Sequence, residues 1–118
     1  MSIEEIFSLL DSPTQKDKEF MQKAYDFAMK AHGNQMRESG EPYFTHIYEV
    51  VKILANLKMS PITIVAGFLH DSIEDNVATD EQIKKEFGDE VLFLVHGVTK
   101  LGKLTYSGAE RHIESLTR

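Results

Sequence analysis

The sequence predicts an all-α fold, and three features of its pattern support this prediction. Apolar residues recur at intervals of three and four along almost the whole chain of 118 residues, which is the period of an amphipathic helix. No segment alternates apolar and polar residues for long enough to indicate a β-strand. Residues typical of helix caps and turns separate the periodic segments. We therefore expect a single helical domain over residues 1–118, with one hydrophobic core.

Three helices are expected in the first half of the chain. The first covers about residues 2–10 and ends at a break around Pro13. The second covers about residues 15–32 and the third about residues 45–57, each with apolar positions on one face. Between them, residues 37–44 combine glycine, proline, charged and aromatic residues without a period, which indicates an ordered loop. The residues of the second helix expected to be buried are Phe20, Ala24, Phe27, Ala28 and Ala31.

Cap residues mark the helices of the second half. Ser60 as N-cap and Pro61 at the first helical position open a fourth helix. Thr79 and Gln82 form the pattern of a capping box, which opens a short fifth helix that Gly88 closes. The residues of the fourth helix expected to be buried are Ile62, Val65, Ala66 and Leu69.

The end of the chain is expected to be irregular over about residues 97–108 and helical from Ala109. Because few residues follow this last helix to pack against it, we expect a helical bundle that is incomplete at its carboxyl end. Such a bundle would leave an apolar face exposed, and a symmetric homodimer would bury that face. The residues expected on this face are Val91, Leu94, Val95, Ile113 and Leu116.

Composition excludes several classes of protein. The chain has no cysteine, so it has neither disulfides nor thiolate metal ligands, and any metal must be bound by His, Asp or Glu. A formal net charge of -6 argues against sequence-independent binding of nucleic acid. The sequence contains no apolar run long enough to span a membrane, and its start lacks the regions of a signal peptide. We therefore expect a cytoplasmic protein that binds neither nucleic acid nor membrane.

The end of the fourth helix is the main candidate for chemistry. Here His70, Asp71, Glu74 and Asp75 place one imidazole and three carboxylates after an otherwise apolar helix. Their spacing puts them on one broad helical face. The carboxylates repel one another and meet the negative end of the helix dipole, and a divalent cation would relieve both penalties. The alternative interpretation is a capped or solvated helix end without metal.

His46 supplies a second imidazole for such a site. It lies at the start of the third helix, 24 residues before His70. Two neighbouring antiparallel helices would bring the start of one close to the end of the other. Two imidazoles and the Asp71 carboxylate would suit Mn²⁺, Fe²⁺ or Zn²⁺, without choosing between them.

The order and spacing of these motifs resemble the RelA/SpoT-type alarmone hydrolases, a group of HD-superfamily metal-dependent phosphohydrolases. The resemblance runs from about residue 20 onward and is carried by residues 37–46, 66–75, 87–88 and 97–101. It implies the amino-terminal part of a hydrolase domain acting in the stringent response. The implied reaction is hydrolysis of guanosine 3′,5′-bis(pyrophosphate), ppGpp or pppGpp, to GDP or GTP and pyrophosphate.

The resemblance also implies a role for each site residue. It makes His46, His70 and Asp71 ligands of Mn²⁺, Glu74 and Asp75 the residues that orient or activate water, and Arg37 and Ser39 residues of the nucleotide pocket. By contrast, His32 is expected to be an ordinary surface or core histidine, and Tyr43 and Phe44 are expected to pack rather than to catalyse.

The sequence departs from the family pattern at three places. Glu38 stands where the family usually has a basic residue, and Ile47 where it usually has proline. The family's fourth ligand, an aspartate of a later helix, has no counterpart before Arg118. The alternatives are therefore a non-catalytic regulatory or dimerising module, part of a bifunctional GTP pyrophosphokinase/hydrolase, or an HD phosphohydrolase for another nucleotide. The loop with Arg37 and Ser39 would, on the alternative interpretation, only pack against the third helix.

Overall fold

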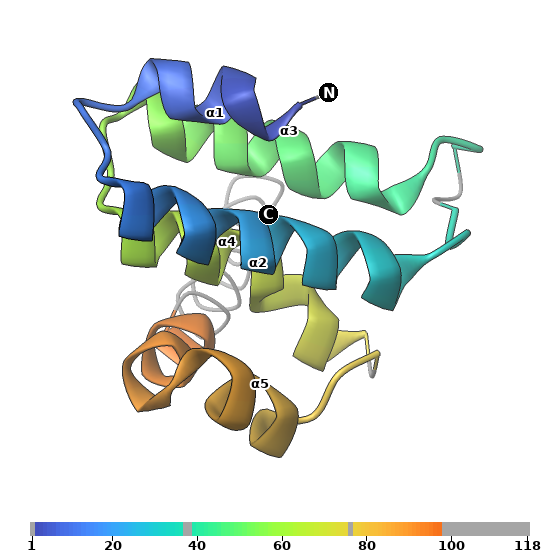
Figure 1. The fold of residues 1–118 in the computed structure, drawn as a ribbon. Coiled ribbons are helices and arrows are strands. Elements are labelled where there is room, and N and C mark those ends of the chain that lie inside the picture. Colours follow the sequence, from blue (N-terminus) through green and yellow to red (C-terminus); the bar gives the residue numbers. More distant parts are fainter. Residues whose placement is uncertain (1, 37–38, 76, 98–118) are drawn as a thin grey trace, which may run out of the picture.

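A computed structural model describes residues 2–36, 39–75 and 77–97 of the chain (Figure 1). The helices are α1 (Ile3–Leu9), α2 (Gln15–His32), α3 (Tyr43–Asn56), α4 (Pro61–Glu74) and α5 (Asp80–Phe87), followed by a helical segment over residues 89–97. Within these residues there is no β-strand, only an isolated bridge between Met36 and Pro42. The predicted all-α fold is confirmed.

The local sequence explains where the helices begin. The Thr14 hydroxyl accepts a hydrogen bond from the Asp17 backbone, and the Asp17 carboxylate accepts one from the Thr14 backbone, both at 3.1 Å. Thr79 and Gln82 form the same reciprocal box at the start of α5, as predicted. Ser60 caps α4 through its hydroxyl. Each such cap stabilises its helix by about 1 kcal/mol, because it satisfies a backbone N–H that has no helical partner.

Helix α3 begins two residues before the predicted start. Pro42 is its N-cap residue, with φ of -57° and no capping side chain. The backbone N–H of Tyr43 instead donates to the carbonyl of Gln35 at 2.9 Å. Tyr43 therefore lies in the first turn of α3 and not in the predicted loop.

Helix α4 lies at the centre of the bundle and packs against both α2 and α3 (Figure 1). Every residue from 64 to 69 is buried, so the helix is covered around its circumference. Gly67 allows a close approach of α3, because a Cβ there would lie 2.7 Å from Leu54 Cδ1. Val65, Ala66 and Leu69 are buried as predicted, but Ile62 is only half-buried, since it lies in the first turn, at the edge of the bundle.

Helix α2 turns small residues toward α4 and aromatic residues toward α5. Ala24 and Ala28 are buried as predicted, whereas Phe20 and Phe27 are half-buried because they cover Phe87 of α5, with ring centroids 5.8 and 5.5 Å apart. The buried positions that the sequence prediction omitted are Met21 and His32, and the predicted Ala31 is half-buried.

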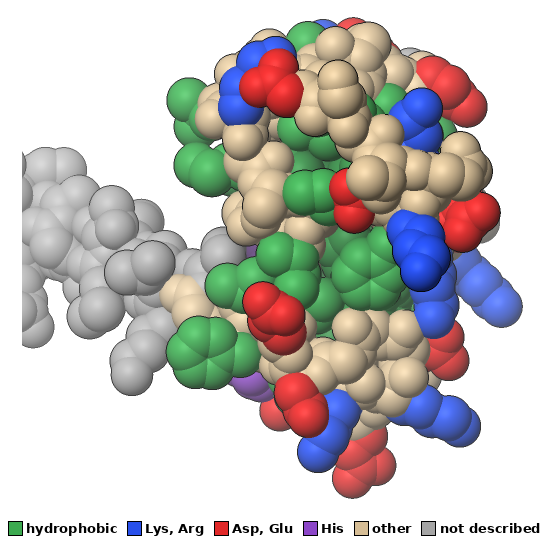
Figure 2. All heavy atoms as spheres, turned by 60° about the vertical axis from the view of Figure 1, so that its left-hand side comes forward, with side chains coloured by type: hydrophobic (Ala, Val, Ile, Leu, Met, Phe, Trp, Pro, Cys, Tyr) green, Lys and Arg blue, Asp and Glu red, His purple; other side chains and the backbone are tan. Residues whose placement is uncertain are grey.

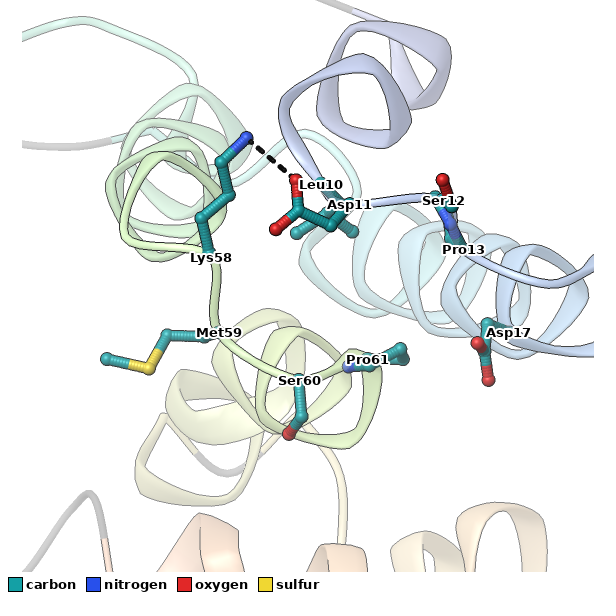
Figure 3. Close-up of a pocket in the computed structure, with 9 residues that line it drawn as sticks. All are labelled: Leu10, Asp11, Ser12, Pro13, Asp17, Lys58, Met59, Ser60 and Pro61. Carbon is teal, nitrogen blue, oxygen red and sulfur yellow. Dashed lines mark ion pairs between the residues drawn. The ribbon is translucent and has the colours of Figure 1, made fainter.

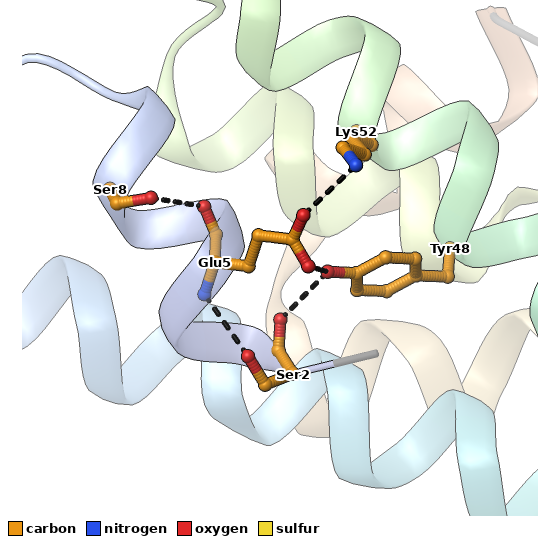
Figure 4. Close-up of polar contacts among 5 residues, drawn as sticks. All are labelled: Ser2, Glu5, Ser8, Tyr48 and Lys52. Carbon is orange, nitrogen blue, oxygen red and sulfur yellow. Dashed lines mark hydrogen bonds and ion pairs between the residues drawn. The ribbon is translucent and has the colours of Figure 1, made fainter.

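A polar cluster joins α1 to α3 (Figure 4). The Tyr48 hydroxyl lies 2.8 Å from Glu5 Oε2 and 3.0 Å from the carbonyl of Ser2, and Lys52 Nζ lies 2.9 Å from Glu5 Oε1. Lys52 and the Tyr48 hydroxyl lower the pKa of Glu5, while burial and the Glu5 carboxylate raise the pKa of Tyr48 to about 12. The cluster is a structural clamp in which the carboxylate has its own cation.

The predicted apolar face at the end of the chain is wrong for two of its members. Val91 and Val95 are buried in the core, and Leu94 is half-buried. Valines four residues apart lie on one face of the helical segment, which is turned inward, while Phe93 on the opposite side is 76% exposed. Ile113 and Leu116 lie outside the described residues. The homodimer therefore stays a prediction, and Val91 and Val95 are not part of a surface that it could bury.

The helices of residues 2–36, 39–75 and 77–97 include none with the length and apolar character needed to cross a membrane. On the face shown in Figure 2, acidic and basic side chains are interspersed and apolar side chains reach the surface between them.

Candidate active site

Three helix ends meet at one end of the bundle. Helices α2, α3 and α4 alternate in direction, so the end of α2, the start of α3 and the end of α4 lie together (Figure 1). The end of α2 brings His32, the start of α3 brings Tyr43 and His46, and the end of α4 brings His70 and Asp71. The predicted approach of α3 and α4 is confirmed by the hydrogen bond between Tyr43 and Asp71.

His70 and Asp71 form a close pair. His70 Nε2 lies 3.1 Å from Asp71 Oδ1, and the two side chains are 16% and 12% exposed. The other ring nitrogen, Nδ1, lies 2.7 Å from the carbonyl of Gly67, which can only accept a hydrogen bond. Neutral His70 therefore carries its proton on Nδ1, and the lone pair of Nε2 faces a carboxylate oxygen. Either a second proton or a cation between these two atoms makes the arrangement favourable.

This geometry fits two ligands of one metal ion. Adjacent ligands at about 2.1 Å from a first-row metal lie roughly 3 Å apart, close to the 3.1 Å between His70 Nε2 and Asp71 Oδ1. In the part of the chain that the structure describes, however, no three His, Asp or Glu residues form a group that could hold a metal. The structure thus brings together two of the three predicted ligands, and His46 is not within the group.

Tyr43 connects His46 to the pair. Its hydroxyl donates to Asp71 Oδ2 at 3.3 Å, and its ring meets the His46 imidazole edge to face, with centroids 5.9 Å apart. Burial, followed by the carboxylates of Asp71 and Asp75, raises the pKa of Tyr43 above its usual value, so the phenol stays a hydrogen-bond donor. The sequence favours a packing role for Tyr43, and the structure adds a hydrogen bond to Asp71. The place of Tyr43 three residues before His46, on the same helical face, was the signal for a shared role.

Asp75 is not the freely solvated residue of the alternative interpretation. It is the C-cap residue of α4, and its backbone N–H donates to the carbonyl of Asp71 at 2.9 Å. Its Oδ2 atom is buried without a hydrogen-bond partner among the described residues. A buried carboxylate oxygen is costly unless a proton donor or a cation meets it. Asp75 therefore adds to the chemical demand for a positive group at this end of α4.

Three predicted site residues remain, namely Arg37, Ser39 and Glu74. Arg37 and the side chain of Glu74 lie outside the described residues, although the Glu74 backbone ends α4. Ser39 is exposed in the loop before α3.

A surface hollow of about 170 Å³ lies at the opposite end of the bundle, between the α1–α2 and α3–α4 connections (Figure 3). Lys58 there pairs with Asp11 at 3.6 Å, and both side chains are more than half exposed. None of the predicted site residues line this hollow. Its charges are solvated and paired, so it does not compete with the helix ends around Asp71.

An all-helical bundle with a histidine–aspartate pair at the end of its central helix is the architecture of an HD-type domain. The chain matches the HD domain family over residues 24–116 and belongs to that family. Hydrolases of this family typically use divalent metals.

Relatives with known names support a narrower resemblance. The chain is 44% identical over 110 residues to the guanosine-3′,5′-bis(diphosphate) 3′-pyrophosphohydrolase of Aquifex aeolicus. The matched segment covers 93% of this chain and 16% of that protein. It is 48% identical over 93 residues to the GTP pyrophosphokinase of Myxococcus xanthus, covering 79% of this chain and 12% of the relative. A GTP pyrophosphokinase rsh of Brucella ovis is 49% identical over 84 residues, 71% of this chain and 11% of the relative. The predicted resemblance to RelA/SpoT-type hydrolases is confirmed, although the chain spans less than a fifth of each relative.

Proposed function

We propose that this chain forms part of a metal-dependent hydrolase domain that removes pyrophosphate from the 3′ position of guanosine 3′,5′-bis(pyrophosphate). The observation that carries the proposal is the His70–Asp71 pair, whose facing nitrogen and oxygen atoms call for a cation. Similarity to the Aquifex aeolicus enzyme supports the choice of a guanine nucleotide as substrate. We place this reaction in the cytoplasm, and we propose Mn²⁺ as the metal.

Metal binding, proton transfer and nucleotide binding would each depend on different site residues. His46, His70 and Asp71 would hold the ion, which supplies Lewis acidity toward water and the phosphoryl oxygens when bound. The Tyr43 hydroxyl occupies Asp71 Oδ2 and so leaves Oδ1 facing His70. The carboxylate of Asp75, together with Glu74, would accept a proton from the attacking water. Arg37 and Ser39 would bind the nucleotide from the loop before α3.

The chain contains a matched control for the site pair. His96 Nε2 lies 3.1 Å from Asp80 Oδ2, the same separation as in the site, but these side chains are 52% and 54% exposed. Asp71→Asn and Asp80→Asn therefore remove one charge each from equally spaced pairs. We expect Asp71→Asn to weaken Mn²⁺ binding by at least about tenfold and Asp80→Asn to leave it unchanged, as measured by calorimetry.

Pyrophosphate release from ppGpp then tests the reaction itself. We expect release by the unaltered chain to require Mn²⁺ and to fall to background in Asp71→Asn. Release by Asp71→Asn at the same measurable rate as the unaltered chain, or equal Mn²⁺ affinity of the two asparagine variants, would contradict the proposed site.

A second candidate function is a non-catalytic HD module. It is favoured by the lack of a three-residue metal group among the described residues. Such a module would bind ppGpp in equilibrium dialysis without releasing pyrophosphate at any Mn²⁺ concentration. Binding without release would therefore select this second function over the first.

A further inference from the structure

His32, the last residue of α2, is buried beneath the candidate site. It is 3% exposed, and both ring nitrogens have partners. Nδ1 lies 3.0 Å from the side-chain oxygen of Gln35, and Nε2 lies 3.4 Å from the hydroxyl of Ser72. The amide oxygen can only accept, so Nδ1 carries the proton and the Ser72 hydroxyl donates to Nε2. These contacts fix the ring in one orientation.

The fixed ring of His32 supports Tyr43. The two rings are stacked with centroids 4.9 Å apart and planes only 11° from parallel. Gln35 holds both partners, since its side chain accepts from His32 and its backbone carbonyl accepts from the Tyr43 N–H at 2.9 Å. Tyr43 is therefore held through its backbone and one ring face by the same short segment.

His32 is linked to the candidate site through two residues, Tyr43 and Ser72. Through Tyr43, His32 acts on Asp71 Oδ2, to which the phenol donates at 3.3 Å, and on His46, which meets the phenol ring. Through Ser72, His32 holds the turn of α4 that follows Asp71 directly. Helix α2, which contributes none of the predicted metal ligands, thus reaches both helices that carry them.

We infer that His32 is a positioning residue, which holds Tyr43 and through it aligns Asp71 with His46 for binding the metal. The inference rests on the proposed function, because the alignment matters only where these residues share an ion. Residues that orient metal ligands typically change metal affinity by about 10–100-fold when they are replaced. A packing histidine would instead affect stability alone.

A double-mutant cycle separates the two roles. We expect His32→Gln, which keeps a polar side chain but removes the ring, to weaken Mn²⁺ binding about tenfold in calorimetry. In a Tyr43→Phe background the same change should weaken Mn²⁺ binding by only about threefold, because the hydrogen bond from the phenol to Asp71 is already lost and only the ring contact with His46 and the contact with Ser72 remain. His96→Gln is the control for replacing a histidine, and its Mn²⁺ affinity should equal that of the unaltered chain.

Ser72→Ala provides a second and milder variant. It removes the hydrogen bond to His32 Nε2 without changing the ring, and alanine is well tolerated in a buried helix. We expect it to weaken Mn²⁺ binding several-fold while the chain stays folded. This variant tests the inference where His32→Gln fails to fold.

A readout without metal separates failure of this inference from failure of the proposed function. The ring-proton NMR signals of His46 should shift in His32→Gln and in Tyr43→Phe, but not in His96→Gln, in metal-free protein. Shifts together with no Mn²⁺ binding by the unaltered chain would overturn the proposed function and keep the positioning role. Unmoved His46 signals, or a loss of Mn²⁺ affinity on His32→Gln that is the same with Tyr43 as with Tyr43→Phe, would overturn the inference.

Discussion

Helix α3 carries two tyrosines that donate to carboxylates, and the two clusters differ in their source of positive charge. Tyr48 donates to Glu5, and Lys52 lies 2.9 Å from that same carboxylate. Tyr43 donates to Asp71, whose ion-pair partner among the described residues is His70, and Asp75 lies beside them with a buried oxygen. The first cluster is complete within the chain. The second holds more negative charge than positive charge, which is the property expected of a site that binds a cation.

The largest effect is expected when the second cluster, like the first, is given a permanent positive charge. His70→Lys would place an ammonium beside Asp71, as Lys52 is placed beside Glu5. We expect Mn²⁺ affinity to fall by at least about a hundredfold, since a ligand is lost and a like charge is added. Calorimetry with Mn²⁺ measures this. Retention of affinity within a few-fold would show that the ion binds elsewhere.

Removing the two phenol hydroxyls compares the clusters directly. Tyr43→Phe and Tyr48→Phe should each lower the free energy of unfolding by about 1 kcal/mol, because each deletes a hydrogen bond to a carboxylate. Only Tyr43→Phe should also weaken Mn²⁺ binding, by roughly tenfold. Denaturant unfolding and Mn²⁺ titration of both variants provide the measurements. A loss of affinity in Tyr48→Phe would remove the distinction between the clusters.

The sequence predicted those features of the two clusters and their helices that depend on residues close together in the chain. Helix spacing places His70, Asp71 and Asp75 on one helix end, and the cap patterns at Ser60 and Thr79 mark helix starts that the structure confirms. These features depend on neighbours three or four residues away, which the sequence displays directly.

The parts that could not be predicted depend on contacts between helices. His32 gains its role from Ser72, 40 residues later, and Tyr43 from Asp71, 28 residues later. A histidine at the end of an amphipathic helix has no sequence feature that distinguishes burial beneath a site from exposure. Val91 and Val95 were assigned to the wrong side because periodicity defines a face without saying what covers it.

Removing the carboxylates themselves should have opposite effects on metal-free stability. We expect Asp71→Ala to hold or slightly raise the melting temperature, because relief of the repulsion from Asp75 offsets the loss of the hydrogen bond from Tyr43. Glu5→Ala should lower the melting temperature, since it leaves Lys52 and Tyr48 without their partner. Differential scanning calorimetry in a chelating buffer measures both. A large destabilisation by Asp71→Ala would mark that residue as structural.

The smallest expected effect is the response of the α1–α3 clamp to acid. Lys52 and the Tyr48 hydroxyl lower the pKa of Glu5 below its ordinary value of 4.5. A carboxyl group whose pKa is lower in the folded state than in the unfolded state contributes stability above the unfolded pKa, and this contribution is lost as the pH falls through the folded pKa. The free energy of unfolding should therefore decrease below about pH 4.5 more steeply in the unaltered chain than in Glu5→Gln. Urea unfolding of the metal-free proteins between pH 6 and pH 3 measures the two slopes, with Glu4→Gln as the control because Glu4 makes no ion pair in the described structure. Parallel slopes for Glu5→Gln and the unaltered chain would mean that Lys52 does not pair with Glu5 in solution. The Glu5 cluster could then no longer serve as the example of a carboxylate with its own cation, against which the Asp71 cluster is compared.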